Sequence, residues 1–497
     1  MSAPLDPNSW EGRAMHAVLP AFSDVTTLKG RGPLVLDHGE GIYVVDVHGK
    51  RYLDANSGLW NSVAGFNHPV LIEAGCRQFR RFPGYHTFFG RMSDVTIELC
   101  ERLIAISPFE SGRVFLTNSG SEANDTVVKI LWLLATHQGQ PQRRKILTRI
   151  NGYHGVTVAA ASMTAKPYNA TFGLPLRDFI HVDCPHYWRY RALDESEEEY
   201  SQRLAERLER VILSEDPNTI AGFFAEPVLG AGGVIPPPAG YFSAIQQVLR
   251  RYNIPLIADE VICGLGRTGV LWGSERFDLK PDIIVASKCI TAGYFPMGAV
   301  IVKPSVADAL GAAITEQEEF AHGFTSAGHP VGCAIALSAI DLIMTGGLLA
   351  NIQALSGEFE SGLATFASHP HVGEVRTAGW MGALEIVENK ETGTPFPAEL
   401  RVSERIANAA LDLGLICRPL GQAIVICPPF IMTAHEMHTM FAMLAETLER
   451  AGHPSFVTAA QETDWSYKKA SYGRLSTRHL GIEAGLGSFG LEVNILT

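Results

Sequence analysis

The sequence predicts an α/β fold in which helices cover a mostly parallel sheet. Between about residues 70 and 330, β-rich runs at 222–225, 256–258 and 282–285 alternate with helical patterns such as the one at 94–106. Strands separated by helices form parallel sheets, because a return to the same edge takes a crossover of helical length. With 497 residues the chain is also longer than one typical domain, so we expect a large core and at least two lobes.

A smaller α+β lobe is predicted from the two ends of the chain. Two short apolar runs around a glycine-containing turn at 41–54 indicate a hairpin. Past residue 330 the sequence shows further helical and strand-like patterns, at 331–344, 349–367, 382–387, 423–426 and 434–451. We therefore divide the chain into an N-terminal part of the small domain (1–69), a large domain (70–330), a C-terminal part of the small domain (331–453) and a tail of unclear role (454–497).

Composition and charge argue against several classes of protein. A formal net charge of −12 opposes binding to nucleic acid. The eight cysteines are scattered without a CxxC pair or a Cys/His cluster, so we predict no metal site. The longest apolar runs, such as 130–135, are too short to cross a membrane. The first residues lack the basic and apolar parts of a secretory signal, so we expect a cytoplasmic location.

An acid and a lysine follow two neighbouring predicted strands. The run at 254–258 leads into Asp259, and the run at 282–287 leads into Lys288. Ligands of open α/β sheets bind at the carboxyl ends of the strands, where both side chains should meet. Between them, the glycines of 264–269 fit the spacing of a dinucleotide-binding loop. Because no strand leads directly into that loop, a nucleotide-binding module is the weaker interpretation.

A second pair of segments suits a phosphate and a flat ring. A predicted strand at 114–117 runs into 118–124 and opens a helix there, so the backbone amides of Gly120 and Ser121 would face an anion. Tyr153, in the glycine-flanked segment 151–155, could stack on a ring.

Taken together, these segments resemble the class III, fold type I aminotransferases over roughly residues 15 to 450. The most specific part runs from Asp259 through the glycines of 264–269 to Lys288, with Gly120-Ser121 upstream and the segment 323–325 downstream. The resemblance implies a large domain with a mostly parallel seven-stranded sheet, a smaller α+β domain, and pyridoxal 5'-phosphate as cofactor. It implies that Lys288 holds the cofactor as a Schiff base and moves the proton, while Asp259 keeps the pyridine nitrogen protonated.

The resemblance also assigns the remaining cofactor contacts. Gly120 and Ser121 would hold the phosphate, and Thr325 would reach it from the neighbouring subunit, which implies a homodimer with active sites at its interface. Whether such dimers pair into tetramers is left open. The ring would lie between Tyr153, in the motif Tyr153-His154-Gly155, and Val261. Glu226 would organise nearby hydrogen bonds or serve as a supporting carboxylate behind the ring.

Within the class, the sequence is most similar to omega-aminotransferases that use pyruvate as amino acceptor and give alanine by a ping-pong mechanism. Trp60 and Phe88 fall where that subgroup lines its amine pocket, and Arg418 falls where it has a mobile arginine for the keto-acid carboxylate. The chain departs from the subgroup at Ser326, where a tyrosine is usual, and at Cys289, where a glycine is usual.

Two questions stay open at this point. The amine donor could be an omega-amino acid, a taurine-like sulfonate, a polyamine or a hydrophobic amine. Aminomutases, racemases and decarboxylases share the scaffold, so Lys288 alone does not decide the reaction. Arg418 favours transamination, because such an enzyme must bind a keto acid in place of the amine.

Overall fold

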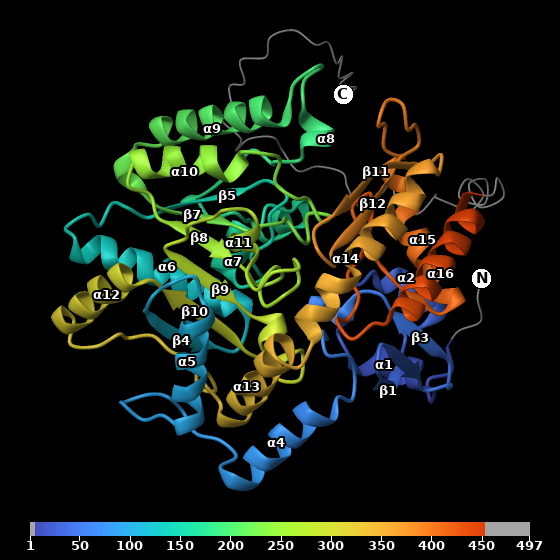
Figure 1. Ribbon diagram of the computed structural model, residues 1–497, viewed down its shortest axis with the longest axis horizontal. Helices are drawn as coiled ribbons and strands as arrows, with labels where there is room; N and C mark the ends of the chain where they lie inside the picture. The colour runs from blue at the N-terminus through green and yellow to red at the C-terminus, as the bar shows by residue number, and fades with distance from the viewer. Residues whose placement is uncertain (1–4, 453–497) are drawn as a thin grey trace. The chain divides into compact units, whose positions relative to one another are not determined.

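The computed structural model describes residues 5–452, and its largest feature is a seven-stranded sheet (Figure 1). Its strands run in the order β4 (Arg113–Thr117), β10 (Gly298–Val302), β9 (Ile283–Ala286), β8 (Leu256–Asp259), β7 (Ile220–Ala225), β5 (Lys145–Arg149) and β6 (Phe179–Val182). All neighbours are parallel except β10, which is antiparallel to β9 and β4. The predicted mostly parallel sheet is confirmed.

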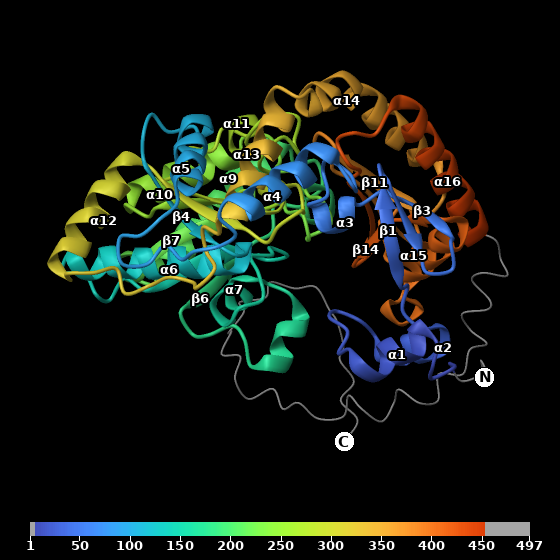
Figure 2. The ribbon, with the colours of Figure 1, turned by 90° about the horizontal axis from the view of Figure 1, so that it is seen from below.

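Helices cover both faces of this sheet (Figures 1 and 2). On one face lie α6 (Gly120–His137), α7 (Val158–Met163) and α12 (Pro304–Glu316). On the other lie α9 (Glu197–Ser214) and α10 (Tyr241–Arg251). The strands are therefore apolar on both sides, as parallel sheets require.

The alternation of side chains along β9 shows how the two faces are filled. Ile283 and Val285 pack with the α6 side, whereas Ile284 and Ala286 belong to the core on the α9 side. Successive side chains of a strand point to opposite faces, so one short apolar run serves two cores. Burying both faces fixes the register of the strand, and this places the residues that follow it.

Three further helices pack together beside the sheet: α4 (Pro69–Arg81), α5 (Asp94–Ile106) and α13 (Pro330–Met344). Helix α13 begins with Pro330 behind the N-cap His329, and most of its length is buried. No single helix in the described part of the chain is long and apolar enough to cross a membrane.

Two four-stranded sheets form the smaller α+β part. The first joins the predicted hairpin to the C-terminal part of the chain, in the order β1 (Leu36–Glu40), β2 (Tyr43–Asp46), β3 (Arg51–Asp54) and β13 (Leu415–Ile416). The second has the order β11 (Val372–Thr377), β12 (Gly382–Ile386), β15 (Ala423–Ile426) and β14 (Arg418–Leu420). Their helices are α14 (Leu348–Ala364), α15 (Val402–Leu413) and α16 (Ala434–Gly452).

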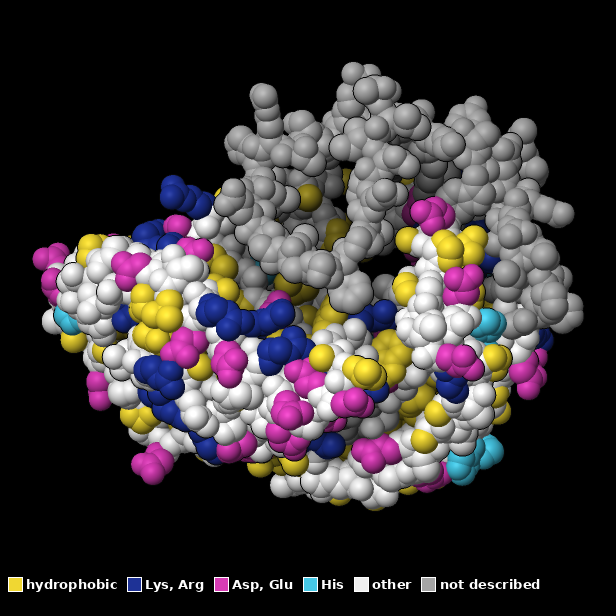
Figure 3. All heavy atoms as spheres, turned by 90° about the horizontal axis from the view of Figure 1, so that it is seen from above, with side chains coloured by type: hydrophobic (Ala, Val, Ile, Leu, Met, Phe, Trp, Pro, Cys, Tyr) yellow, Lys and Arg dark blue, Asp and Glu magenta, His cyan; other side chains and the backbone are white. Residues whose placement is uncertain are grey.

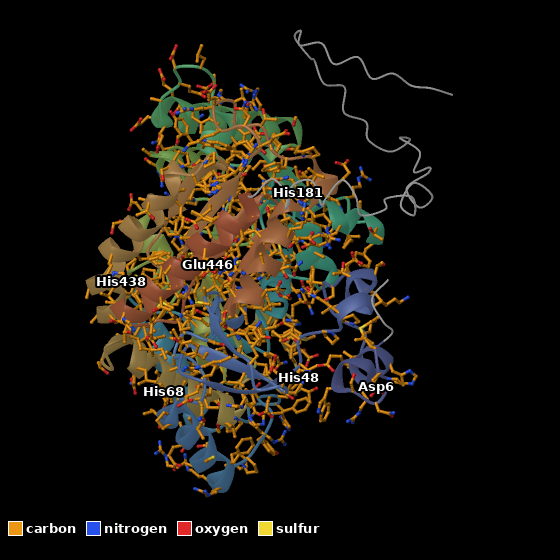
Figure 4. The ribbon with its side chains drawn as sticks, turned by 90° about the vertical axis from the view of Figure 1, so that its right-hand side faces the viewer. Asp6, His48, His68, His181, His438 and Glu446 are labelled. Carbon is orange, nitrogen blue, oxygen red and sulfur yellow. The ribbon has the colours of Figure 1, made fainter. Side chains whose placement is uncertain are left out.

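The remaining α-helices are short: α1 (Trp10–Ala17), α2 (Val25–Arg31), α3 (Ser57–Trp60), α8 (Tyr187–Tyr190) and α11 (Gly273–Arg276). Figure 4 shows the N-terminal segment with Asp6 near the hairpin that carries His48. The Nε2 atom of His48 lies 2.6 Å from Oε1 of Glu11 in α1, which ties this segment to the hairpin. On the face seen in Figure 3, acidic and basic side chains are interspersed.

The predicted elements agree with the observed ones to within a few residues. The helix predicted at 349–367 ends earlier, at Ala364, and a 3-10 turn follows it (Thr365–Ser368). The loop 264–269 does not open a helix directly, since α11 starts only at Gly273 and has four residues. The domain boundaries stay predictions, and the tail predicted at 454–497 lies outside the described residues.

Candidate active site

Three parallel strands end at one edge of the large sheet and bring two acids and a lysine together. Glu226 follows β7, Asp259 ends β8, and Lys288 follows β9 by two residues. The ammonium charge of Lys288 is coupled to both carboxylates. Lys288 also adopts a left-handed backbone conformation, with φ of 43°, which is costly for a residue other than glycine. The residue predicted to be catalytic therefore has a strained backbone conformation.

Asp259 is held by two side chains and one backbone N–H group. Its Oδ2 lies 2.8 Å from Nδ1 of His154 and accepts a hydrogen bond of 2.9 Å from Nδ2 of Asn124. Its Oδ1 accepts a bond of 3.1 Å from the backbone N–H of Val261. His154 is itself buried, so it acts on the site through Asp259 rather than by stacking on a ring. The carboxylate has one fixed orientation.

The surroundings of Lys288 favour its neutral form. Burial lowers the pKa of its ammonium group, the carboxylate of Asp259 opposes that shift, and the nearby Arg418 adds to it. The Nζ atom lies 5.7 Å from the centre of the Trp60 ring, and Cζ of Arg418 lies 4.3 Å from the same ring. The amine of Lys288 and the guanidinium of Arg418 thus lie at the same buried indole ring.

Helix α6 starts at this edge with the geometry of an anion site. Ser119 is its N-cap and accepts from the N–H of Glu122. The first N–H groups of a helix have no intrahelical acceptor, so those of Gly120 and Ser121 are suited to bind an anion at this end of α6. A Cβ atom on Gly120 would lie 2.9 Å from Cγ2 of Val261, and one on Gly155 would lie 2.4 Å from Oγ of Ser121. Glycine is required at both positions for this close approach.

Glu226 organises the loop that carries the predicted stacking residue. Its Oε1 accepts from the backbone N–H of Tyr153, and its Oε2 accepts from that of Gly230, each at 3.0 Å. Burial raises the pKa of Glu226, and burial likewise raises that of the half-buried Tyr153 phenol. Tyr153 is thereby anchored through its backbone, while its ring stays free to face a ligand.

These features fit pyridoxal phosphate. The helix start at Gly120 suits its phosphate, the buried Asp259 suits its pyridinium nitrogen, and Lys288 suits its aldehyde. Tyr153 and Val261 supply an aromatic and an aliphatic wall. Within residues 5–452 no group of three His, Cys, Asp or Glu side chains could hold a metal ion.

Two predicted site residues lie apart from this cluster within one chain. Thr325 is exposed. Phe88 packs on the loop that contains Thr325, since a Cβ atom on Gly323 would lie 2.7 Å from the Phe88 ring. Thr325 was expected to reach the phosphate from the neighbouring subunit, and Phe88 was expected to line the amine pocket; both assignments stay predictions.

The structure adds three residues to the substrate side of the site. Nζ of Lys166 donates to the carbonyl oxygen of Ala231 at 3.0 Å, and burial lowers its pKa. Burial raises the pKa of Tyr168 to about 12, and this phenol is coupled to Arg418. The ring of Phe22 meets that of Tyr168 edge to face, with centroids 5.7 Å apart. Their segments carry no motif, so only the folded chain reveals them.

Known proteins share this architecture. The family profile described as "Aminotransferase class-III" matches residues 27–448. A probable gamma-aminobutyrate transaminase 3, mitochondrial, of Oryza sativa subsp. indica is 41% identical over 444 residues, covering 89% of this chain and 86% of the relative. The pyridoxamine-phosphate-bound aminotransferase of Vibrio fluvialis is 58% identical with a TM-score of 0.89, covering 92% of this chain and 99% of the other. An omega-aminotransferase of Paracoccus denitrificans is 60% identical with a TM-score of 0.88, covering 89% and 99%.

Proposed function

Because the chain belongs to the class-III aminotransferases, and is thus a pyridoxal-phosphate-dependent transaminase, we propose that it moves an amino group from a primary amine or omega-amino acid to pyruvate, giving alanine. The observation that carries the choice of acceptor is Arg418. Its guanidinium lies over Trp60 beside Lys288, and within residues 5–452 no carboxylate forms an ion pair with it. A half-buried arginine of this kind is a ready partner for the carboxylate of a keto acid.

Each residue of the site has a part in this reaction. When bound, pyridoxal phosphate supplies the electron sink for the pair left behind when a proton leaves the substrate carbon. Lys288 takes that proton on Nζ and returns it, which its lowered pKa favours. Asp259, fixed by His154 and Asn124, holds the pyridine nitrogen in its protonated form. Gly120 and Ser121 bind the phosphate through the start of α6.

In a ping-pong reaction one pocket must bind first an amine without a carboxylate and then a keto acid. Arg418 stands on the short edge strand β14, and its side chain rests on the flat face of Trp60. Stacking on an aromatic ring lets a guanidinium slide at small cost, since it keeps no fixed hydrogen bond. Arg418 would therefore grip a keto acid and move aside for an apolar amine.

The class of donor follows from the walls of the same pocket. Trp60, Tyr153 and Tyr168 present aromatic surface, and Phe22 extends it toward solvent. Lys166 adds a second cation on this side, which could meet the distant carboxylate of an omega-amino acid. We expect both apolar amines and omega-amino acids as donors.

We propose that the active enzyme is a homodimer. Large apolar side chains are exposed on α4, on α5 and on the loop between them, and Phe89 in that loop is 83% exposed. The others are Val70, Ile72, Phe79, Phe82, Tyr85, Met92 and Ile97. Exposed apolar surface of this extent is typical of an interface. A second copy on this face would also bring Phe88 and Thr325 toward a neighbouring site.

An amine panel tests the proposal. The holoenzyme is incubated with pyruvate and with apolar amines, polyamines, taurine and omega-amino acids, and the alanine formed is quantified. Lys288→Ala serves as the control without the catalytic amine. We expect alanine from several donors with the native enzyme and none with the control. Carbon dioxide, a shifted amino group or a racemised product in place of alanine would assign the site to one of the other reactions of this scaffold.

A further inference from the structure

His322 lies three residues before Thr325 and attaches that loop to helix α6. Its Nε2 is 2.9 Å from Oγ1 of Thr126, and its Nδ1 is 3.0 Å from Nζ of Lys129. Both partners belong to α6, one helical turn apart on the same face. The loop is thus bonded to the helix at two points through a single side chain.

Aromatic packing fixes the plane of the same ring. The imidazole stacks on Phe115 of β4, with centroids 5.5 Å apart and an interplanar angle of 14°. Phe320 and Phe324, on either side of it in sequence, meet it edge to face at 5.5 and 5.0 Å. The ring has little freedom to rotate, so its hydrogen bonds are preorganised.

The hydrogen bonds assign one tautomer to His322. Oγ1 of Thr126 donates its own proton to the carbonyl oxygen of Glu122, at 2.7 Å, so it can only accept from His322. Nδ1 faces the ammonium of Lys129 and therefore accepts. His322 is neutral with its proton on Nε2, and burial together with Lys129 lowers its pKa to about 4. The attachment consequently persists across the physiological pH range.

Helix α6 is also the element that starts at the phosphate site. Oε2 of Glu122 accepts from the N–H of Asn118, which closes the turn presenting Gly120 and Ser121. A continuous set of bonds therefore runs from that turn, through Glu122 and Thr126, to His322 and the loop of Thr325. One end of α6 serves the cofactor of its own chain, and the attached loop faces outward.

We propose that His322 is a positioning residue that sets Thr325 for the cofactor phosphate of the neighbouring subunit. The inference rests on the homodimer of the proposed function. Other anchors of this loop lie on either side of Thr325: Phe88 packs on Gly323, Oγ1 of Thr87 donates a long bond of 3.4 Å to the carbonyl oxygen of Ala327, and Oγ1 of Thr96 donates a bond of 2.9 Å to that of Gly328. His322 is the anchor that joins the loop to α6. Without His322 the threonine hydroxyl would sample several positions and lose a charge-assisted hydrogen bond, weakening cofactor binding about tenfold.

Two mixed dimers of equal composition test this directly. In the first, a Lys288→Ala chain pairs with a His322→Phe chain, so the one intact Lys288 meets Thr325 from a chain with native His322. In the second, a chain with both substitutions pairs with a native chain, so the intact Lys288 meets Thr325 from the altered loop. Differently tagged full-length chains give both dimers, and titration with pyridoxal phosphate is followed by the visible absorbance of the Lys288-bound cofactor.

We expect cofactor binding about tenfold weaker in the second dimer than in the first. The first should match a reference dimer of Lys288→Ala with native chain. His322→Gln, which keeps a donor toward Thr126, should restore most of the affinity, and His137→Phe at the far end of α6 should change nothing. Equal weakening in both dimers, or none in either, would overturn the proposal. A reference dimer that takes up no cofactor would overturn it together with the proposed function.

Discussion

Replacing Arg418 with methionine tests whether this residue binds the carboxylate of the amino acceptor. The guanidinium can make two charge-assisted hydrogen bonds to a carboxylate, each contributing about 1.5 kcal/mol in a partly buried site. Their loss costs about 3 kcal/mol, or roughly 100-fold in kcat/KM for pyruvate. Methionine keeps the unbranched stem of the side chain, which preserves packing on Trp60.

Acetaldehyde is the matched acceptor, because it has the skeleton of pyruvate without the carboxylate. Steady-state kcat/KM is measured for both acceptors with the same amine donor, in the native enzyme and in Arg418→Met. Any loss of the stacking contact with Trp60 affects both acceptors and cancels in the ratio. We expect the preference for pyruvate to fall about 100-fold. Arg418→Lys keeps the charge without the bidentate geometry and should lose about tenfold. An unchanged ratio of the two acceptors would refute the reasoning.

Three further outcomes follow from the cofactor side of the site. Lys288 must be neutral to react, and burial lowers its pKa, so capture of pyridoxal phosphate by the apoenzyme should rise with pH to a midpoint below the usual 10.5. Asp259→Asn removes the opposing carboxylate and should move that midpoint lower still. A midpoint at or above 10.5 would contradict this. Asn124→Ala removes the 2.9 Å bond to Asp259, so titration should show cofactor binding weakened about tenfold, whereas unchanged binding would mean that the bond is dispensable. Gly120→Ala places a methyl group 2.9 Å from the valine opposite and should cost about 1–3 kcal/mol of cofactor binding by calorimetry, whereas Gly311→Ala, in open space within α12, should leave binding intact.

The sheet and the central pair of the site were predictable from the sequence for a physical reason. Parallel strands buried on both faces are short continuous apolar runs, and their carboxyl ends share one edge. Asp259 and Lys288 could therefore be placed together from the runs that precede them. The hairpin was equally predictable, because its turn and both strands are contiguous in the sequence. The structure pairs β2 with β3 as predicted.

Other parts of the site could not be read from local patterns. Asn124 lies on α6, 135 residues before the carboxylate it contacts, and in the sequence it looks like any polar residue of a capped helix. Lys166 and Tyr168 reach the pocket from a 3-10 segment and its lead-in, where neither periodicity nor spacing marks them. Their roles depend on contacts across the fold, which only the packed chain displays.

Borohydride trapping of the holoenzyme, followed by peptide mass mapping, tests the central claim most directly. Reduction converts a Schiff base between a lysine and pyridoxal phosphate into a stable secondary amine. We predict a single phosphopyridoxyl adduct, located on Lys288, which disappears when an amine donor is added before the borohydride. An adduct on another lysine, or a protein that takes up no pyridoxal phosphate, would contradict the assignment of this site.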